Sequence, residues 1–336
     1  MKSITAIYEV GENATRLIEI DVPMPTLGPR DVLVQVKAVA ANPVDYKVRD
    51  GMATGDKRIL GWDAAGVIHS VGDNVQSFKP GDKVWYAGNI SRDGAYAAFQ
   101  AVDERIISHM PSSLGYEEAA ALPLSSITAW EILFDRLKVQ LAPPTQQKSI
   151  LIIGAGGGVG SILTQLAAKV ANLKVIATAS RPESAQWARS MGAHHVIDPR
   201  ADWREQLNKV NVHSVDYIAS LTASGEHLAK SADILTPQGA FCLIDDPEQL
   251  DIRGFKRKSI SIHWELMFTR SLFETDDMNE QGRLLQRVAE LIDDGVLQST
   301  VNGPVRSLNV ETLEATHKEF RAGTAVGKRV FSVSLS

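Results

Sequence analysis

Residues 150–161 have the sequence Ile150-Leu151-Ile152-Ile153-Gly154-Ala155-Gly156-Gly157-Gly158-Val159-Gly160-Ser161. An apolar run typical of a buried strand leads into a glycine-rich turn and then into a pattern typical of an amphipathic helix. A dinucleotide needs this arrangement, because its pyrophosphate approaches the backbone closely and lies at a helix N-terminus. Glycine permits both the tight turn and the close approach, since it has no Cβ. We therefore predict a dinucleotide site with contacts at Gly154, Gly157, Gly158, Val159 and Gly160.

The spacing of these glycines differs from the strict pattern G-x-G-x-x-G, so an ordinary strand–helix turn with surplus glycine is the alternative interpretation. The sequence after the turn favours the dinucleotide site, because strand and helix patterns alternate from residue 148 onward, as in a doubly wound parallel sheet. The predicted strands are 149–153, 174–178, 196–197, 215–219 and 240–244, and the predicted helices are 159–171, 182–191, 204–210, 226–235 and 281–293.

The end of the second predicted strand indicates which cofactor is bound. NAD-binding folds usually have Asp or Glu about 20 residues after the glycine turn, where the carboxylate holds the ribose 2′-OH. This chain has Ser180 and Arg181 at that place. An arginine pairs with a 2′-phosphate through charge-assisted hydrogen bonds, so we predict NADPH rather than NADH. The alternatives are a helix N-cap for Ser180 and a solvated surface position for Arg181.

The first third of the chain has strand patterns without intervening helices. Turn residues separate three apolar or alternating runs, which predict a compact, barrel-like β domain. The pattern of residues 116–137 is helical, with an interruption at Pro123. The tail does not continue the strand–helix repeat, so we expect the helix 310–321 and the strand 328–333 to return to the β domain. The three strand-like runs are Asp31–Val39, Ala64–Gly72 and Asp82–Tyr86.

Composition narrows the class of protein further. The 336 residues include 35 Lys and Arg against 40 Asp and Glu, a net charge of −5, so neither nucleic acid nor an anionic membrane is an expected partner. Cys242 is the only cysteine, which excludes an internal disulfide and a four-cysteine zinc cluster. No stretch approaches the roughly 20 apolar residues of a membrane helix, and the N-terminal pattern is that of a strand rather than a signal peptide. We expect a cytoplasmic protein.

Several short motifs occur in a fixed order around the glycine turn. They are Asn42-Pro43-Val44-Asp45, Gly61-Trp62-Asp63-Ala64-Ala65-Gly66-Val67-Ile68, Val71-Gly72-Asp73-Asn74-Val75, Phe78-Lys79-Pro80-Gly81-Asp82-Lys83-Val84, Ala119-Ala120-Ala121-Leu122-Pro123 and Thr128-Ala129-Trp130. In this order they resemble the medium-chain dehydrogenase/reductase superfamily, specifically its quinone oxidoreductase (zeta-crystallin-like) branch and the zinc-type alcohol dehydrogenase-like proteins. The resemblance implies an α/β fold with a GroES-like β domain, residues 1–124 and 298–336, and a Rossmann NADPH-binding domain, residues 125–297. It also implies an active site in the cleft between the two domains.

Zinc-dependent members of that superfamily hold the metal with a Cys, a Gly-His-Glu segment and a second Cys. This chain has Asn42 at the first place, Gly61-Trp62-Asp63 at the second and Leu124-Ser125-Ser126 around the third. A catalytic zinc needs about three N, S or O ligands, and Asp63 alone does not form such a site. The eight histidines are scattered along the chain, apart from an adjacent pair at 194–195. We therefore predict a protein without zinc.

Without a metal, the reaction needs an acceptor that is already electrophilic. Oxidation of an alcohol uses a Lewis acid to stabilise the alkoxide, whereas a quinone or an α,β-unsaturated carbonyl accepts hydride directly and needs only hydrogen-bond donors and a proton. The resemblance therefore implies a zinc-independent NADPH-dependent oxidoreductase that reduces quinones or α,β-unsaturated carbonyls by hydride transfer. The alternatives are an alcohol dehydrogenase or carbonyl reductase of the zinc-type family and a non-enzymatic NADPH-binding scaffold.

Position by position, the resemblance assigns roles to further residues. Asn42 is expected near the nicotinamide as a donor to the substrate oxygen, unless it only caps the turn at Pro43. Tyr46 is the candidate proton donor, since a phenol can protonate an enolate, although many relatives have the tyrosine one residue later, at the position of Lys47. The other expected cofactor contacts are Thr128, Leu221, Thr222, Ile244, Asp245 and Lys328, with helix packing for Thr128 and a surface position for Lys328 as alternatives.

Bulky apolar residues are expected to line a flat, hydrophobic substrate pocket. In relatives the segment 262–268 lies beside the nicotinamide and the dimer edge, which implies the pocket residues Trp62, Trp264, Met267 and Phe268. Packing in a core is the alternative. Relatives pair through edge strands of the cofactor domain, so the resemblance implies a homodimer that acts on a small hydrophobic carbonyl or quinone.

Overall fold

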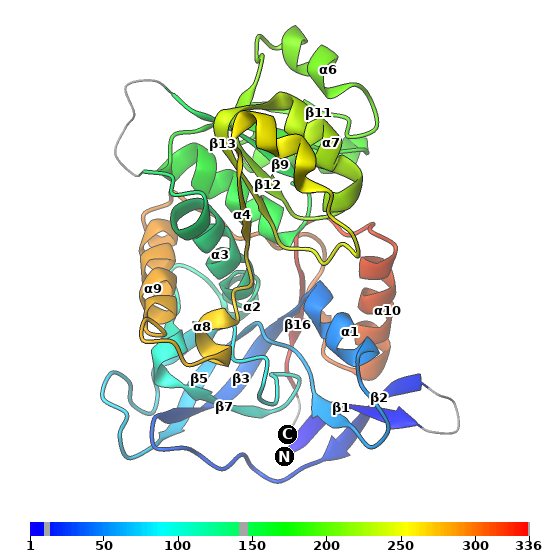
Figure 1. Cartoon of the computed structure of the whole chain (residues 1–336). Coiled ribbons are helices and arrows are strands. Elements are labelled where there is room, and N and C mark those ends of the chain that lie inside the picture. The colour runs from blue at the N-terminus through cyan, green and yellow to red at the C-terminus, as the bar shows by residue number, and fades with distance from the viewer. Residues whose placement is uncertain (10–13, 141–146, 335–336) are drawn as a thin grey trace. The chain divides into compact units, whose positions relative to one another are not determined.

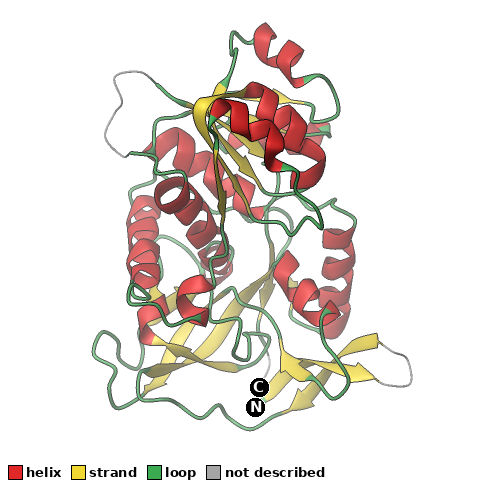
Figure 2. Ribbon diagram, viewed as in Figure 1, coloured by secondary structure: helices red, strands yellow, loops and turns green. Residues whose placement is uncertain are grey.

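The computed structural model describes residues 1–9, 14–140 and 147–334, and the chain divides into two compact units. The first unit comprises Met1–Ile127 and Phe268–Ser336, and the second comprises Thr128–Met267. The fold is α/β, as predicted, with mainly antiparallel strands in the first unit and alternating strands and helices in the second (Figures 1 and 2). Among the described residues, no helix combines the length and the apolar character needed to cross a membrane.

The first unit contains two sheets. The larger has the strand order β15-β16-β3-β5-β6-β8, with β7 also paired to β3, and the smaller has the order β2-β1-β4. β3 is buried along almost its whole length, and its run of Val and Ala side chains suits such a central strand. The strands are β1 (Lys2–Glu9), β2 (Ala14–Asp21), β3 (Asp31–Ala41), β4 (Lys57–Ile59), β5 (Ala64–Val71), β6 (Lys83–Tyr86), β7 (Phe99–Asp103), β8 (Ile107–His109), β15 (Arg306–Ser307) and β16 (Arg329–Ser332).

The tail of the chain returns to the first unit, as the sequence predicted. β16 pairs antiparallel with the end of β3, so that Arg329 faces Ala41. This register places Lys328, the residue before β16, beside Asn42, the residue after β3. Two residues 286 positions apart in the sequence therefore become neighbours through one strand pairing.

Helices connect and flank these sheets. Pro123 interrupts the predicted helix 116–137, because proline suits the first turn of a helix but not its interior. The continuation beyond α3 is π-helical. The elements are α1 (Pro43–Asp50), η1 (Glu104–Ile106), α2 (Tyr116–Ala120), α3 (Pro123–Trp130), α8 (Thr269–Leu272), α9 (Glu280–Asp293) and α10 (Val310–Arg321), whereas the π-helical continuation η2 (Glu131–Arg136) belongs to the second unit.

Residues 268–297 belong to the first unit, whereas the sequence analysis assigned them to the NADPH-binding domain. Helix α9 explains the difference. Gln286 Oε1 accepts a hydrogen bond from Ser108 Oγ at 2.9 Å, and the Asp293 carboxylate accepts from the amides of Ser112 and Ser113 at 3.0 and 2.9 Å. Apolar periodicity identifies an amphipathic helix, but it does not indicate which sheet the helix packs against.

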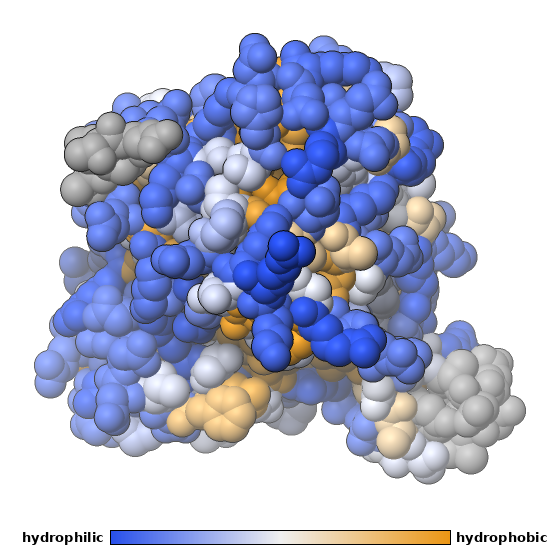
Figure 3. Space-filling model, turned by 45° about the horizontal axis from the view of Figure 1, so that its top comes forward, coloured by the Kyte–Doolittle hydropathy of each residue, from blue (hydrophilic) through white to orange (hydrophobic). Residues whose placement is uncertain are grey.

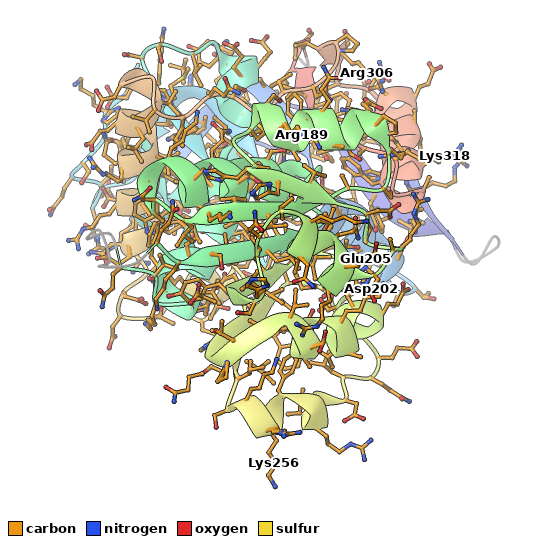
Figure 4. The ribbon with its side chains drawn as sticks, turned by 90° about the horizontal axis from the view of Figure 1, so that it is seen from above. Arg189, Asp202, Glu205, Lys256, Arg306 and Lys318 are labelled. Carbon is orange, nitrogen blue, oxygen red and sulfur yellow. The ribbon has the colours of Figure 1, made fainter. Side chains whose placement is uncertain are left out.

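The second unit is built on a parallel sheet in the order β11-β10-β9-β12-β13-β14. Figure 4 shows helices on both sides of this sheet, with Arg189 on α5 and with Asp202 and Glu205 at the start of α6. Asp202 caps that helix, because its Oδ1 accepts from the Glu205 amide at 2.8 Å. The elements are β9 (Ser149–Ile153), α4 (Gly158–Gln165), η3 (Leu166–Val170), β10 (Lys174–Thr178), α5 (Pro182–Ser190), β11 (His195–Ile197), α6 (Trp203–Lys209), β12 (Val215–Ser220), α7 (Ser224–Ile234), β13 (Leu235–Leu243), η4 (Ile252–Lys258) and β14 (Ser261–Trp264).

The central strands of this sheet form the core of the second unit. Leu151, Ile218 and Phe241 are fully buried in one apolar cluster, as expected for strands covered on both faces. The sequence analysis did not assign β14, which lies at the edge of the sheet beside β13. Polar side chains cover most of the face seen in Figure 3, and hydrophobic groups appear there in separate patches.

Candidate functional site

The glycine-rich turn connects β9 to α4 in the second unit. Gly154 has a φ of +82°, a left-handed conformation that favours glycine, and its amide donates to Thr178 Oγ1 at 3.1 Å. Gly160 permits close packing, because a Cβ atom there would lie 2.6 Å from the Gly154 carbonyl oxygen and from Ala155 Cα. At these two positions the fold itself requires glycine.

The first turn of α4 has the features of an anion site. The amides of residues 158–160 have no acceptor within the helix, and they form the positive end of its dipole. A Cβ atom on Gly157, the N-cap, would have its nearest neighbour at 3.7 Å, so space remains for the close approach of a ligand. The residues present therefore fit the pyrophosphate of a dinucleotide, and the predicted contacts Gly157, Gly158, Val159 and Gly160 lie together here.

This turn lies at the topological switch point of the sheet. β9 has β10 on one side and β12 on the other, and the chain reaches β12 only after it has formed β10 and β11. Nucleotides bind at such points, beyond the carboxyl ends of the strands. The predicted contacts Leu221 and Thr222 follow β12, and Thr222 Cγ2 would lie 3.0 Å from a Cβ atom on Gly154. The structure thus brings these two segments together.

Ile244 and Asp245 follow β13 at the same edge of the sheet. Asp245 holds the start of α7, because its Oδ2 accepts from the Ser224 amide at 2.9 Å and its Oδ1 accepts from the Ser224 hydroxyl. Asp245 therefore has a structural role in this loop, and its predicted contact with the cofactor stays a prediction. Thr128 is buried on α3, where its predicted contact also stays a prediction.

Two arginines lie near the carboxyl end of β10. Ser180 is exposed, and Arg181 rather than Ser180 is the N-cap of α5. Arg200 comes from the loop after the neighbouring strand β11, and its Nη2 donates to the Ser180 carbonyl oxygen at 3.1 Å. Hydrogen bonds from Arg200 to Asp198 lower the pKa of that carboxyl to about 2. Sequence reasoning missed Arg200, because its proximity to Ser180 depends on the pairing of β10 with β11.

A group of polar side chains is buried in the first unit. Asn42, Asp63 and Lys328 are 4%, 0% and 3% exposed. Lys328 Nζ donates to Asn42 Oδ1 at 2.6 Å and to Asp63 Oδ2 at 2.7 Å, and Asn42 Nδ2 donates to Asp63 Oδ2 at 3.0 Å. The Leu124 amide donates to Asp63 Oδ1 at 2.9 Å. We call these three side chains and the Leu124 amide the Lys328 cluster.

Asn42 was predicted to donate a hydrogen bond to the substrate oxygen, and the contacts of its side chain bear on that role. Its side-chain amide donates to Asp63 and, at 3.4 Å, to the Ala40 carbonyl oxygen, so it is engaged within the protein. Burial raises the pKa of Asp63, and the charge of Lys328 and the Leu124 amide oppose that rise. Three donors surround the Asp63 carboxylate, which is the environment that an ionised carboxylate needs when it is buried.

Asp45 lies beside the Lys328 cluster and is fully buried. Its Oδ2 accepts from the Asn42 amide and from the Tyr96 hydroxyl, both at 2.7 Å, whereas its Oδ1 has no partner within the part of the chain that the structure describes. Burial raises the pKa of Asp45 to about 7, although both of these hydrogen bonds lower it. Tyr96 lies in a stretch without a recognisable motif, which is why sequence analysis did not find it.

Tyr46, the predicted proton donor, contacts α10. Its ring centroid lies 4.5 Å from the Arg321 guanidinium and 6.4 Å from the ring of His317. Neither residue belongs to the Lys328 cluster. The role of Tyr46 in proton transfer stays a prediction, and Lys47, the position of the tyrosine in many relatives, is exposed on the same helix.

The predicted substrate-pocket residues have different surroundings. Trp62 and Phe268 pack edge to face in the first unit, with ring centroids 6.3 Å apart, and both are buried. Met267 is also buried, whereas Trp264 at the end of β14 is 59% exposed. The pocket formed by these four residues stays a prediction.

The first unit also contains a surface groove of about 520 Å³. Its walls include Thr5, Ile59, Arg92, Phe99 and Gln100. None of the site residues predicted from the sequence lines this groove, so we do not assign the reaction to it.

Comparison with known proteins identifies the family. The Alcohol dehydrogenase GroES-like domain matches residues 28–118, and the Zinc-binding dehydrogenase domain matches residues 158–287. A zinc-type alcohol dehydrogenase-like protein from Staphylococcus epidermidis is 34% identical over 96% of this chain and 95% of its own length. The crystal structure of a candidate zinc-dependent alcohol dehydrogenase from Rhizobium etli CFN 42 is 46% identical, with a TM-score of 0.92 over 98% of both chains. The chain belongs to the medium-chain dehydrogenase/reductase superfamily of oxidoreductases.

Two further relatives bear on the reaction. Quinone oxidoreductase from Mus musculus is 31% identical over 76% of this chain and 77% of its own length. A 2-methylene-furan-3-one reductase from Solanum lycopersicum is 36% identical over 54% of this chain and 48% of its own length. Similar sequences in the superfamily thus include proteins named for alcohol, quinone and enone substrates.

The names of several relatives imply a catalytic zinc, and the residues of this chain do not fit one. Among the described residues, no group of three or more His, Cys, Asp or Glu side chains is placed to hold a metal ion. By the resemblance, Asn42 takes the place of the first Cys, and Trp62 and Asp63 take the places of the His and the Glu of the Gly-His-Glu segment. A lysine ammonium contacts the side chains of Asn42 and Asp63. We therefore derive no step through a metal.

Proposed function

We propose that this protein is a zinc-independent, NADPH-dependent oxidoreductase that reduces quinones or α,β-unsaturated carbonyls by hydride transfer. Two features of the same chain together support this proposal best. The glycine turn at residues 154–160 is shaped for a dinucleotide, and Lys328 contacts Asn42 and Asp63 where the resemblance leads one to expect zinc ligands. The relatives named for quinone and enone reduction support the same reaction class.

NADPH is the cofactor that the second unit favours. When bound, it supplies the hydride for a two-electron reduction. The amides at the start of α4 would hold its pyrophosphate, and Arg181 and Arg200 would hold its 2′-phosphate. We expect Arg181→Ala to lower the ratio of kcat/KM for NADPH to that for NADH by about tenfold, since one charge-assisted contact is lost. An unchanged ratio would contradict this role.

The proposed acceptor is a small hydrophobic carbonyl or quinone. Such an acceptor is electrophilic without a Lewis acid, so the protein needs to exclude water, orient the acceptor and provide a proton. Trp62 and Phe268, two of the proposed pocket residues, are buried against each other in the first unit, and Tyr46 is the proposed proton donor. Tyr46→Phe should lower kcat while the Kd for NADPH stays unchanged. Equal kcat values for the two proteins would remove Tyr46 from the mechanism.

A substrate screen tests the reaction class. NADPH oxidation is followed with 9,10-phenanthrenequinone, small quinones, enones, enals and simple aldehydes, with and without a chelator. Turnover of quinones or enones that a chelator does not affect supports the proposal. Cofactor binding without any turnover favours a non-enzymatic scaffold.

The second candidate is an alcohol dehydrogenase or carbonyl reductase of the zinc-type family. The 46% identity to the Rhizobium etli protein favours it. Its signature in the same screen is turnover of simple aldehydes alone, abolished by a chelator.

We also propose a homodimer that forms through β14. Among the described strands this edge strand pairs only with β13, and Trp264 and Leu266 at its end are 59% and 51% exposed. Light scattering coupled to size-exclusion chromatography should give the mass of a dimer for the wild type and of a monomer for Trp264→Lys. A monomeric wild type would contradict the proposal.

A further inference from the structure

The three chain segments at which zinc-dependent relatives have their ligands meet in the first unit of this protein. Asn42 follows β3, Asp63 precedes β5, and Leu124 lies in the first turn of α3. All three belong to the Lys328 cluster, through the Asn42 side chain, the Asp63 carboxylate and the Leu124 amide. The fold therefore keeps the convergence of a metal site although the ligand side chains differ.

We propose that the Lys328 ammonium is the built-in cation of this site, which takes the place of zinc, excludes a metal ion and positions Asn42. This inference rests on the proposed function and deepens it, because it names the group that occupies the place of the Lewis acid. Lys328 acts through Asn42 and Asp63, so it is a positioning residue rather than a catalytic one.

Exclusion of a metal follows from the contacts of the two oxygen atoms. Asn42 Oδ1 and Asp63 Oδ2 both accept from Lys328, at 2.6 and 2.7 Å, and Asp63 Oδ1 accepts from the Leu124 amide. A divalent ion on these oxygens would lie close to the ammonium in a buried site, where repulsion between like charges is strong. It would also have to displace the amide at the start of α3.

The same contacts fix the Asn42 side chain. Its Oδ1 faces the ammonium and its Nδ2 faces Asp63, so the exchange of the two ends of the amide would replace two favourable contacts by two repulsive ones. Asp63 in turn lies at the N-terminus of α3, where a carboxylate is favoured. The ion pair thus links the end of β3, the start of β5, the start of α3 and the start of β16.

Metal analysis is the first test. Protein expressed in zinc-supplemented medium, and protein incubated with zinc chloride and then desalted, is analysed by inductively coupled plasma mass spectrometry. We expect zinc far below one atom per chain in both preparations. Zinc near one atom per chain that a chelator removes only slowly would overturn the proposal.

Charge coupling is the second test. Lys328→Met leaves the Asp63 carboxylate buried without its cation, Asp63→Asn leaves the ammonium without its anion, and the double variant removes both charges. Each single variant should lower Tm by roughly 5–10 °C, and the double variant should recover at least half of that loss. Lys318→Met on α10 is the matched control, because Lys318 is exposed (Figure 4), and its Tm should stay within about 1 °C of the wild type. Additive losses in the double variant would overturn the ion pair. If one single variant fails to fold, a double variant that also fails to fold would overturn it instead.

Positioning has its own kinetic signature. In Lys328→Met with an active quinone substrate, kcat should fall about tenfold or more. If the Kd for NADPH measured by fluorescence rises as well, Lys328 is the cofactor contact that the resemblance implied and the positioning role fails. Lys328→Arg retains the charge and should recover part of kcat. A Lys328→Met protein with unchanged kcat would overturn the positioning role. If no substrate is turned over at all, the proposed function fails, and the metal content and the charge coupling still decide this inference.

Discussion

The glycine turn of the second unit and the Lys328 cluster of the first are built in opposite ways. The turn is a continuous segment, residues 154–160, and its shape depends on backbone conformation and on the absence of Cβ atoms. The cluster draws on positions 42, 63, 124 and 328, and it depends on charge and burial. The turn contains no ionisable side chain, whereas the cluster has an ion pair with a buried carboxyl beside it.

This difference predicts different sensitivities. Changes in the turn should act through steric fit and should not depend on pH. Changes near the cluster should act through charge and should depend on pH. Substitutions in the two regions can therefore support this contrast or remove it.

The largest effect is expected for Asp45→Asn. Burial raises the pKa of Asp45 from 3.8 to about 7, so the folded protein keeps a proton that the unfolded chain releases above about pH 4. The stability from that proton is complete below pH 4 and is lost as the pH rises through 7. Because Asn does not titrate, the free energy of unfolding of Asp45→Asn relative to the wild type should increase by roughly 3 kcal/mol from pH 5 to pH 8. Urea unfolding at the two pH values measures this difference.

Asp293→Asn is the control for this prediction. Hydrogen bonds from Ser113 and Ser112 lower the pKa of Asp293 to about 2, so its carboxylate is ionised in the folded and the unfolded protein above pH 5. The difference in free energy of unfolding between Asp293→Asn and the wild type should stay constant between pH 5 and pH 8. If the difference in free energy of unfolding between Asp45→Asn and the wild type is equally constant, Asp45 is ionised in the folded protein. The region of the Lys328 cluster would then show no pH dependence, and the predicted contrast with the glycine turn would fail.

The next largest effect is expected for Gly160→Ala. The new Cβ would lie 2.6 Å from two backbone atoms, and backbone cannot move aside as a flexible side chain can. We expect a loss of about 2 kcal/mol in the free energy of unfolding of the protein without cofactor, equal at pH 5 and pH 8. A loss that changes with pH would show that the turn is coupled to a titrating group.

Gly157→Ala is the matched substitution in the same turn. Its Cβ would meet its nearest neighbour at 3.7 Å, an ordinary van der Waals contact, so the loss of stability should stay below about 1 kcal/mol. Equal losses for Gly157→Ala and Gly160→Ala would mean that steric fit does not explain the glycines. The two substitutions thus distinguish a glycine that the packing of the turn requires, Gly160, from one that leaves space for a ligand, Gly157.

These two regions also show how far sequence reasoning reaches. The turn, the parallel sheet, the break at Pro123 and the return of the tail were predicted, because each depends on a local pattern or on the family resemblance. Arg200 was missed, because its proximity to Ser180 depends on the pairing of β10 with β11. Tyr96 was missed, because it lies in a stretch without a recognisable motif and its partner Asp45 is distant in the sequence. Helix α9 was recognised as a helix but assigned to the other unit, since an apolar stripe does not identify its partner.

A smaller effect is expected for Ser161→Ala, which tests whether the turn is as local as its sequence suggests. Ser161 Oγ donates to the Gly157 carbonyl oxygen at 2.6 Å and accepts from Trp187 Nε1 at 2.7 Å, so it joins the turn to α5. Loss of this bridge should lower the free energy of unfolding by roughly 1–2 kcal/mol and should change the fluorescence of Trp187. Ser190→Ala is the control, because among the described residues its hydroxyl donates only to the Trp187 carbonyl oxygen, on the exposed side of α5. Equal effects of the two substitutions would argue against the bridge.

The smallest effect is expected for Arg200→Ala, at the edge of the second unit where the proposed nucleotide would bind. Arg200 contacts the Ser180 carbonyl oxygen across the pairing of β10 with β11, and under the proposed function it adds a second positive charge near the 2′-phosphate. Since Asp198 already balances part of this charge, we expect the Kd for NADPH to rise only about threefold to tenfold, with the Kd for NADH unchanged. Fluorescence titration with the two nucleotides measures both constants.

Arg204→Ala is the matched control, because Arg204 pairs with Asp233 and has no contact with Ser180 in the described residues. If both variants bind NADPH equally well, the charge at this edge is a solvated surface feature. The preference for NADPH would then depend on Arg181 alone, within one continuous segment as in the glycine turn.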